Sequence, residues 1–164
     1  MRLTHSWRVR LVLLLACFLL GTAFVAGAND HVILCGGPAL RQWEDLRREH
    51  EQHDRWWANF VRASTLRMSQ IRLEHGEGAT LVWIVYRRGY LNRGNADNKP
   101  YLDWIEALAK KRNCELIWIE NGEQAIKAIN ARSPRSIRTF DFFGHSNRHA
   151  FLLDYGSDIM AISK

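Results

Sequence analysis

The feature that most constrains the fold is an alternation of apolar runs and amphipathic segments between residues 80 and 143. Three short runs are rich in β-branched and aromatic side chains, as expected of strands covered on both faces: residues 80–86, 115–119 and 139–143. The two segments between them carry apolar side chains at helical spacing, and Asn121 followed by Gln124 is typical of a helix N-terminus. This order predicts an α/β fold, a three-layer sandwich with a mainly parallel sheet.

The region before this core adds one more short apolar run and a long amphipathic helix. Residues 31–35 read as a strand that ends at Gly36-Gly37-Pro38. Large side chains then recur every three or four positions from residue 40 to residue 73, without an intervening Gly or Pro. This spacing predicts one continuous helix of more than about 30 residues that precedes the sheet. Residues 92–99, rich in Asn and Gly, are expected to form a polar loop.

The N-terminal 28 residues are typical of a signal peptide. Arg2, Arg8 and Arg10 form a basic region, residues 11–25 are almost entirely apolar, and Ala26-Gly27-Ala28 offers a cleavage site. An uncleaved membrane anchor is the alternative, because the apolar stretch is close to the length that spans a bilayer. Either reading places the rest of the chain outside the cytoplasm, as a periplasmic or secreted protein or as an anchored one. Residues 29–79 and 80–164 are expected to form one domain.

Charge and cysteine content exclude some classes of function. Lys and Arg outnumber Asp and Glu by 23 to 17, and three of the arginines belong to the signal segment. This balance does not indicate nucleic-acid binding. After the signal only Cys35 and Cys114 remain, and they can form a disulfide or stay as free thiols. His50 and His53 lack the spacing of a helical metal motif, so we expect no metal and no cofactor.

The candidate functional residues lie where two of the predicted strands end. Arg87 and Arg88 follow the strand at 80–86, and His145, Ser146 and Asn147 follow the strand at 139–143. In open parallel sheets, ligands bind beyond the carboxyl ends of the strands. If these two strands are neighbours, a cationic pair lies beside a histidine and a hydroxyl, where an anionic or carbonyl-containing substrate would bind.

The segment from Phe140 to Asp154 resembles the region around the catalytic histidine of the caspase-like cysteine peptidases, which include metacaspases and gingipains. The shared pattern is an apolar strand, Gly144-His145 and a small residue, and then the strand of a short hairpin. The resemblance implies a caspase-like half-fold with His145 as the catalytic histidine. It also implies that the amide of Gly144 helps to form the oxyanion hole and that Arg87 contacts a peptide substrate.

The same resemblance raises the question of the nucleophile. In that family the catalytic cysteine follows the next core strand, but no cysteine follows His145 here. We therefore expect either a truncated product or a member that has lost catalysis, with a peptide or protein as its substrate or partner.

Two alternatives from other classes stay open. One is a non-enzymatic interaction module of the cell envelope, in which the long helix docks a partner. The other is a serine hydrolase that uses Ser146, although Arg148 stands where the nucleophile elbow needs a small residue.

Overall fold

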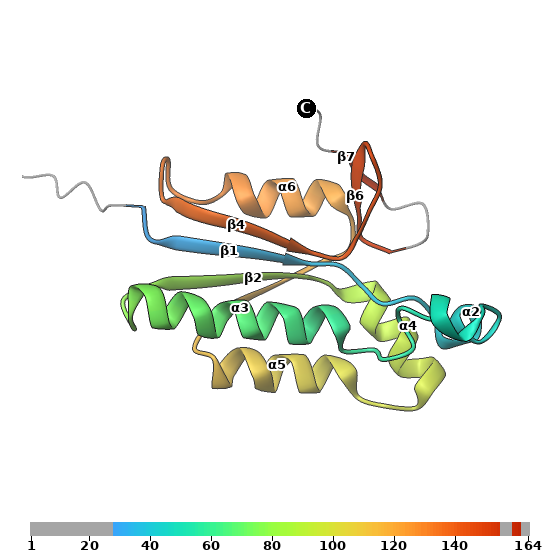
Figure 1. The fold of residues 1–164 in the computed structure, drawn as a ribbon. Coiled ribbons are helices and arrows are strands. Elements are labelled where there is room, and N and C mark those ends of the chain that lie inside the picture. The colour runs from blue at the N-terminus through green and yellow to red at the C-terminus, as the bar shows by residue number, and fades with distance from the viewer. Residues whose placement is uncertain (1–27, 155–158, 162–164) are drawn as a thin grey trace, which may run out of the picture.

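The structure is a computed structural model that describes residues 28–154 and 159–161, and it shows a parallel sheet between two layers of helices (Figure 1). The helices are α2 (Arg41–Asp45), a short 3-10 helix (Glu49–Glu51), α3 (Asn59–His75), α4 (Arg87–Asp97), α5 (Tyr101–Lys111) and α6 (Gly122–Asn130). The strands are β1 (Asp30–Cys35), β2 (Thr80–Tyr86), β3 (Glu115–Ile119), β4 (Ile137–Phe143), β5 (His145–Ser146), β6 (Ala150–Leu152) and β7 (Ile159–Ala161).

The main sheet has the strand order β3-β2-β1-β4, and every pair in it is parallel. The chain moves outward from β1 through β2 to β3 and then returns to place β4 on the other side of β1. The strand order therefore reverses between β1 and β4, which is where open α/β sheets bind ligands. Strands β5, β6 and β7 form a small antiparallel sheet beyond this edge.

Each face of the sheet has its own apolar core. Ile33 and Trp83 point toward α3 and α5, where they meet Met68 and Ile105. Val32, Leu34, Val82 and Ile84 point to the opposite face, where they meet Ala125 of α6. Strands β1 and β2 are buried on both faces, which explains their continuous apolar sequences. The predicted α/β sandwich with a parallel sheet is confirmed.

The prediction of one long helix from residue 40 to residue 73 is wrong. The segment is divided into α2, the 3-10 helix and α3, and only α3 has the expected buried stripe. Backbone groups near Asp54 bond to side chains far away in the sequence. The amide of Asp54 donates to Glu44, and the carbonyl groups of Asp54 and Arg55 accept from Arg93. These tertiary hydrogen bonds replace the main-chain hydrogen bonds between successive turns that a continuous helix would need.

The expected polar loop at residues 92–99 is also wrong over most of its length, because α4 continues to Asp97. This helix has no apolar stripe from which it could be predicted. Its buried face consists of two glycines, Tyr90 and Arg93, so tertiary contacts stabilise it. The predicted cap of α6 is confirmed, because the amide of Gln124 donates to Oδ1 of Asn121 at 2.9 Å.

The proposed signal segment lies outside the described residues except for Ala28. Within residues 28–154 and 159–161, none of the helices is long and apolar enough to cross a membrane.

A buried histidine at the amino end of the sheet gives a prediction about stability. His31 is fully buried, and its ring stacks on that of His75 with 4.8 Å between centroids. Burial, His75 and two nearby arginines, Arg138 and Arg67, lower the pKa of His31, and the opposing effect of Asp141 is smaller. The unfolded chain therefore binds more protons than the folded chain below the ordinary histidine pKa of 6.5. We expect the free energy of unfolding, measured in urea, to fall as the pH decreases from 6.5 to about 5.

The variant His31→Asn should flatten this pH dependence. His50→Asn is the matched control, because the side chain of His50 is exposed and should leave the slope unchanged. Carboxyl groups with a lowered pKa, such as Asp30 and Asp97, lose their contribution to the free energy of unfolding only at a lower pH than this range. A slope that persists in His31→Asn between pH 6.5 and 5 would contradict the assignment.

Candidate functional site

The carboxyl ends of β1 and β4 are held together by main-chain contacts that glycines permit. The amide of Gly36 donates to the carbonyl of Phe143 at 2.8 Å, and the amide of Gly37 donates to the carbonyl of Leu153. A Cβ on Gly36 would lie 3.3 Å from the Cα of Gly144. These contacts bring the start of the loop after β1 close to the turn that carries His145.

His145 lies against the carboxylate of Asp54 at this edge. Its Nε2 lies 2.7 Å from Oδ2 of Asp54, and the two side chains are 13% and 2% exposed. The imidazole ring also packs edge-on against Phe60 of α3, with 5.0 Å between ring centroids. A histidine ring held by a carboxylate on one nitrogen is the orientation that general acid–base catalysis uses.

The charge of Asp54 is maintained despite its burial. Burial raises the pKa of this carboxyl, but the bond with His145 and the amide of Ala39, which lies 3.0 Å from Oδ2, together hold its pKa below the usual value. Asp54 therefore faces His145 as a carboxylate at neutral pH, which favours a proton on Nε2.

Arg93 fixes the backbone around Asp54. The guanidinium is 2% exposed and donates four hydrogen bonds, to the carbonyls of Ala39, Asp54 and Arg55 and to Oδ2 of Asp97. The loop after β1 and the segment before α3 are thus attached to the same side chain of α4. Sequence reasoning did not find Asp54 or Arg93, because one lay in a predicted helix and the other in a predicted loop.

Two of the residues predicted for the site, Arg87 and Arg88, lie apart from His145. They begin α4 after β2, and β1 lies between β2 and β4 in the sheet. The expectation that these strands are neighbours is therefore wrong. Arg87 lies 3.5 Å from Glu120 at the end of β3, and Arg88 is exposed.

The other two predicted residues belong to the hairpin beyond β4. Ser146 follows His145 on β5, where successive side chains point to opposite faces, so its hydroxyl points away from the imidazole. Oδ1 of Asn147 accepts from the amides of His149 and Ala150, which makes Asn147 a turn former. Gly144 connects β4 to His145, and the ring of Phe142 lies close to its Cα.

Neither cysteine of the described residues has the lowered pKa of an activated nucleophile, and neither forms a disulfide. Cys35 is fully buried, with its sulfur 3.3 Å from the hydroxyl of Tyr90, and burial raises its pKa to about 11. Burial also raises the pKa of Cys114 to about 11, and this residue precedes β3 at the opposite end of the sheet from His145. A thiol with such a pKa is almost entirely protonated at neutral pH.

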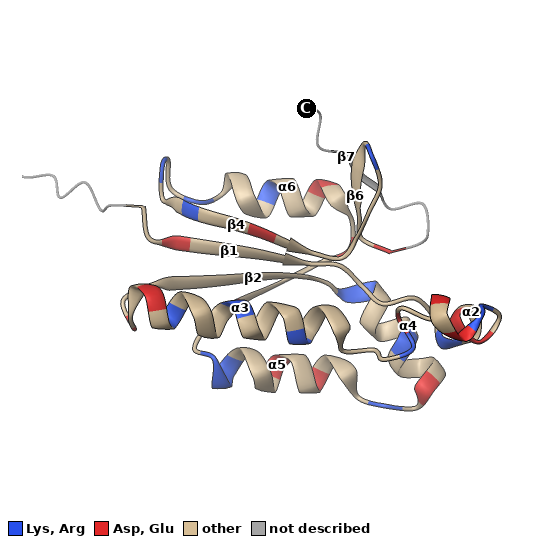
Figure 2. Cartoon of the chain, viewed as in Figure 1, with Lys and Arg blue, Asp and Glu red and all other residues tan. Residues whose placement is uncertain are grey.

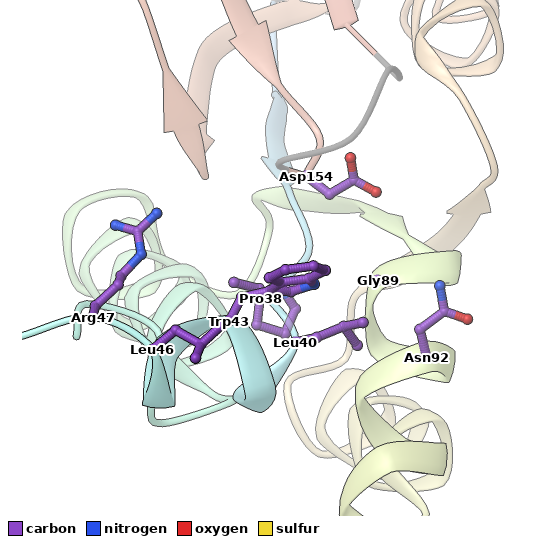
Figure 3. A pocket seen from close by; sticks show the side chains of 9 residues that line it. Pro38, Leu40, Trp43, Leu46, Arg47, Gly89, Asn92 and Asp154 are labelled. Carbon is purple, nitrogen blue, oxygen red and sulfur yellow. The ribbon is translucent and has the colours of Figure 1, made fainter. Parts of the chain in front are cut away.

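A cleft of about 540 Å³ opens beside the loop after β1 (Figure 3). Ala39, whose amide donates to Asp54, belongs to its wall and connects the cleft with the pair of His145 and Asp54. The remaining lining residues come from the loop, α2, α4 and the end of β6: Pro38, Leu40, Trp43, Leu46, Arg47, Gly89, Asn92 and Asp154. Within the described residues, no group of three His, Cys, Asp or Glu side chains could hold a metal ion.

Comparisons of the chain with protein-family models, with curated proteins and with solved structures gave no match.

Proposed function

We propose that the chain is an exported domain related to the caspase-like cysteine peptidases, which retains a working histidine and does not complete the thiol reaction. The observation that supports this proposal most strongly is the 2.7 Å pair of His145 and Asp54. It lies where the strand order reverses, beside a cleft large enough for a small ligand.

We assign each member of the pair a role. Nε2 of His145 faces Asp54, so Nδ1 is the nitrogen that exchanges a proton with a bound ligand. Asp54 positions the ring and stabilises the imidazolium that forms when Nδ1 accepts a proton. A carbonyl-containing ligand, such as a peptide, is the substrate class that this chemistry serves.

Cleavage by a cysteine nucleophile is not part of the proposal. Cys35 is shielded from solvent, its pKa is about 11, and Cys114 lies beyond the other end of the sheet. We therefore expect a domain that binds its ligand and does not turn it over through these thiols. The serine-hydrolase alternative is weakened because the side chains of Ser146 and His145 diverge on β5.

The test is a measurement of the His145 proton. In protein labelled with ¹⁵N-histidine, we expect a proton on Nε2 that exchanges slowly and resonates downfield of the amides, because Nε2 is buried and lies only 2.7 Å from a carboxylate oxygen. The variant Asp54→Asn replaces the charged acceptor with a neutral one. The resonance should then move markedly upfield or disappear through exchange with water.

Asp141→Asn is the matched control, because Asp141 is also a partly buried carboxylate that an arginine, Arg67, binds at 3.0 Å. It should leave the His145 resonance in place, and His145→Gln assigns the signal by its loss. If the wild type shows no such proton, or if Asp54→Asn retains it unchanged, the proposal is overturned.

A non-enzymatic binding module is the second candidate, and the cleft favours it. The original form of this idea, a partner docked on one long helix, does not apply because that helix is interrupted. The cleft offers a different surface for binding.

A further inference from the structure

The cleft has the position and the size of a ligand site. Its floor is the loop after β1 and the first turn of α4, and Asp154 at the end of the small sheet lies above it (Figure 3). The volume of about 540 Å³ falls within the range of sites that bind drug-sized molecules, about 300 to 1,000 Å³.

One wall of the cleft consists of large apolar side chains that are poorly covered by the protein. Trp43 is 56% exposed and Leu46 is 80% exposed, and both belong to the segment of α2 that faces the loop after β1. Pro38 and Leu40 line the same cleft, so four apolar side chains contribute to its wall (Figure 3). A ligand with an apolar group would remove this surface from water.

The polar groups of the cleft carry opposite charges and lie apart. Arg47 and Asn92 lie on opposite sides of the Trp43 ring, and Asp154 projects from above (Figure 3). Arg47 lies 3.6 Å from Glu44, and Asp154 accepts from the hydroxyl of Tyr86 at 2.9 Å. A carboxylate has two acceptor oxygens, and the bond from Tyr86 uses Oδ2 of Asp154.

This arrangement discriminates by charge. Acidic and basic residues are also mixed along α2 and the segment after it (Figure 2). A ligand with a net charge would meet a like charge at one side of the cleft. A neutral group with both a donor and an acceptor can pair its N–H with Asp154 and its C=O with Arg47 or Asn92.

We propose that this cleft binds a neutral amide that carries a bulky apolar group, with the apolar group against Trp43 and Leu46. The inference deepens the proposed function, on which it rests for the position of the cleft beside His145, because it names the chemical class of ligand that the cleft takes.

The experiment is a titration of the full chain with N-acetyl-phenylalaninamide, followed by ¹H–¹⁵N NMR. We expect saturable shifts of the Trp43 indole N–H and of the Asn92 side-chain amide. N-acetyl-aspartamide with a free side-chain carboxylate and N-acetyl-lysinamide should bind at least about tenfold more weakly, which corresponds to about 1.4 kcal/mol.

Matched variants locate the site. Trp43→Ala should weaken the binding about tenfold or more, and Leu46→Asp should weaken it similarly, because each removes part of the apolar wall. Trp56→Ala and Leu73→Asp alter side chains of comparable exposure, 47% and 88%, outside the cleft, and they should bind as the wild type does.

Three results would overturn the proposal: no saturable shift with the apolar amide, equal binding of the charged amides, or equal losses in Trp43→Ala and Trp56→Ala. The variant Asp54→Asn separates the two proposals. Amide binding that persists there while the His145 proton is lost supports both, and a His145 proton without amide binding refutes the cleft alone.

Discussion

Replacement of Arg93 with methionine is expected to destabilise the protein by about 3 to 5 kcal/mol. The variant leaves Asp97 as a partly buried carboxylate without its cation, and three main-chain carbonyls lose their donor. Urea unfolding followed by circular dichroism measures the loss. Arg93→Lys should lie between wild type and Arg93→Met, because an ammonium can still reach Asp97 and cannot bind all three carbonyls.

Arg132→Met is the matched control for this prediction. Arg132 also binds two carboxylates, Asp30 and Glu115, but it lies at the opposite end of the sheet, and its side chain is 19% exposed. We expect a smaller loss than in Arg93→Met, because no main-chain carbonyl loses its donor and Asp30 keeps its hydrogen bond from Ser136, and we expect an unchanged His145 resonance. Equal losses in the free energy of unfolding in Arg93→Met and Arg132→Met would show that the bonds of Arg93 to the main chain add no particular stability. The folded fraction of Arg93→Lys should show a weaker His145 resonance, because the backbone of Asp54 is less firmly held.

The second large effect is expected from alanine at the contact between the loop after β1 and α4. A Cβ on Gly89 would lie 2.7 Å from the Cα of Gly37, and a Cβ on Gly37 would lie 2.8 Å from the Cα of Gly89. Both contacts are with backbone, which cannot rotate away. We therefore expect each substitution to lower the free energy of unfolding by about 1 to 3 kcal/mol. For Gly89 this loss outweighs the gain of about 1 kcal/mol that alanine usually brings to a helix.

Gly78→Ala provides the comparison, because no atom lies within 4 Å of the Cβ it would add. Its effect should stay within about 0.5 kcal/mol. The double variant Gly37→Ala and Gly89→Ala should cost less than the two single changes together, since the first change already separates the backbones. Full additivity, or a neutral Gly89→Ala, would show that the two segments can move apart freely. Amide binding in the cleft should weaken in Gly89→Ala, because Gly89 is part of its lining.

Among the described residues, His145 and the two thiols have contrasting surroundings. His145 is held by a charged, buried carboxylate, whereas Cys35 is buried next to Tyr90 with its pKa raised to about 11. Thiol modification would therefore act on Cys114 before Cys35, and it would act far from His145.

Much of the sheet could be predicted from the sequence because its signals are local. Strands β2 and β3 are continuous apolar runs, and α5 and α6 have apolar stripes at helical spacing. The turn at Gly144 and the position of His145 after a strand were also local signals. Each of these elements buries its apolar side chains in the way its own sequence indicates.

The errors arose where distant side chains replace local hydrogen bonds. The segment from α2 to α3 has helical spacing, but Arg93 and Glu44 bond to the backbone of Asp54 and Arg55 and interrupt the helix. In α4 the sequence is rich in Asn and Gly, and the helix forms because its glycines and Arg93 pack against the loop after β1. No local pattern contains this information.

By itself, the sequence determined the parallel α/β class and placed a histidine at the end of a strand, because burial and hydrogen bonding along one segment are enough to specify a strand or a helix. The tertiary structure decided what surrounds that histidine. β1 enters between β2 and β4, which separates Arg87 from His145 and brings Asp54 to it instead. The order of strands and the meeting of distant charges depend on how the whole chain packs, and therefore the site became visible only in the folded protein.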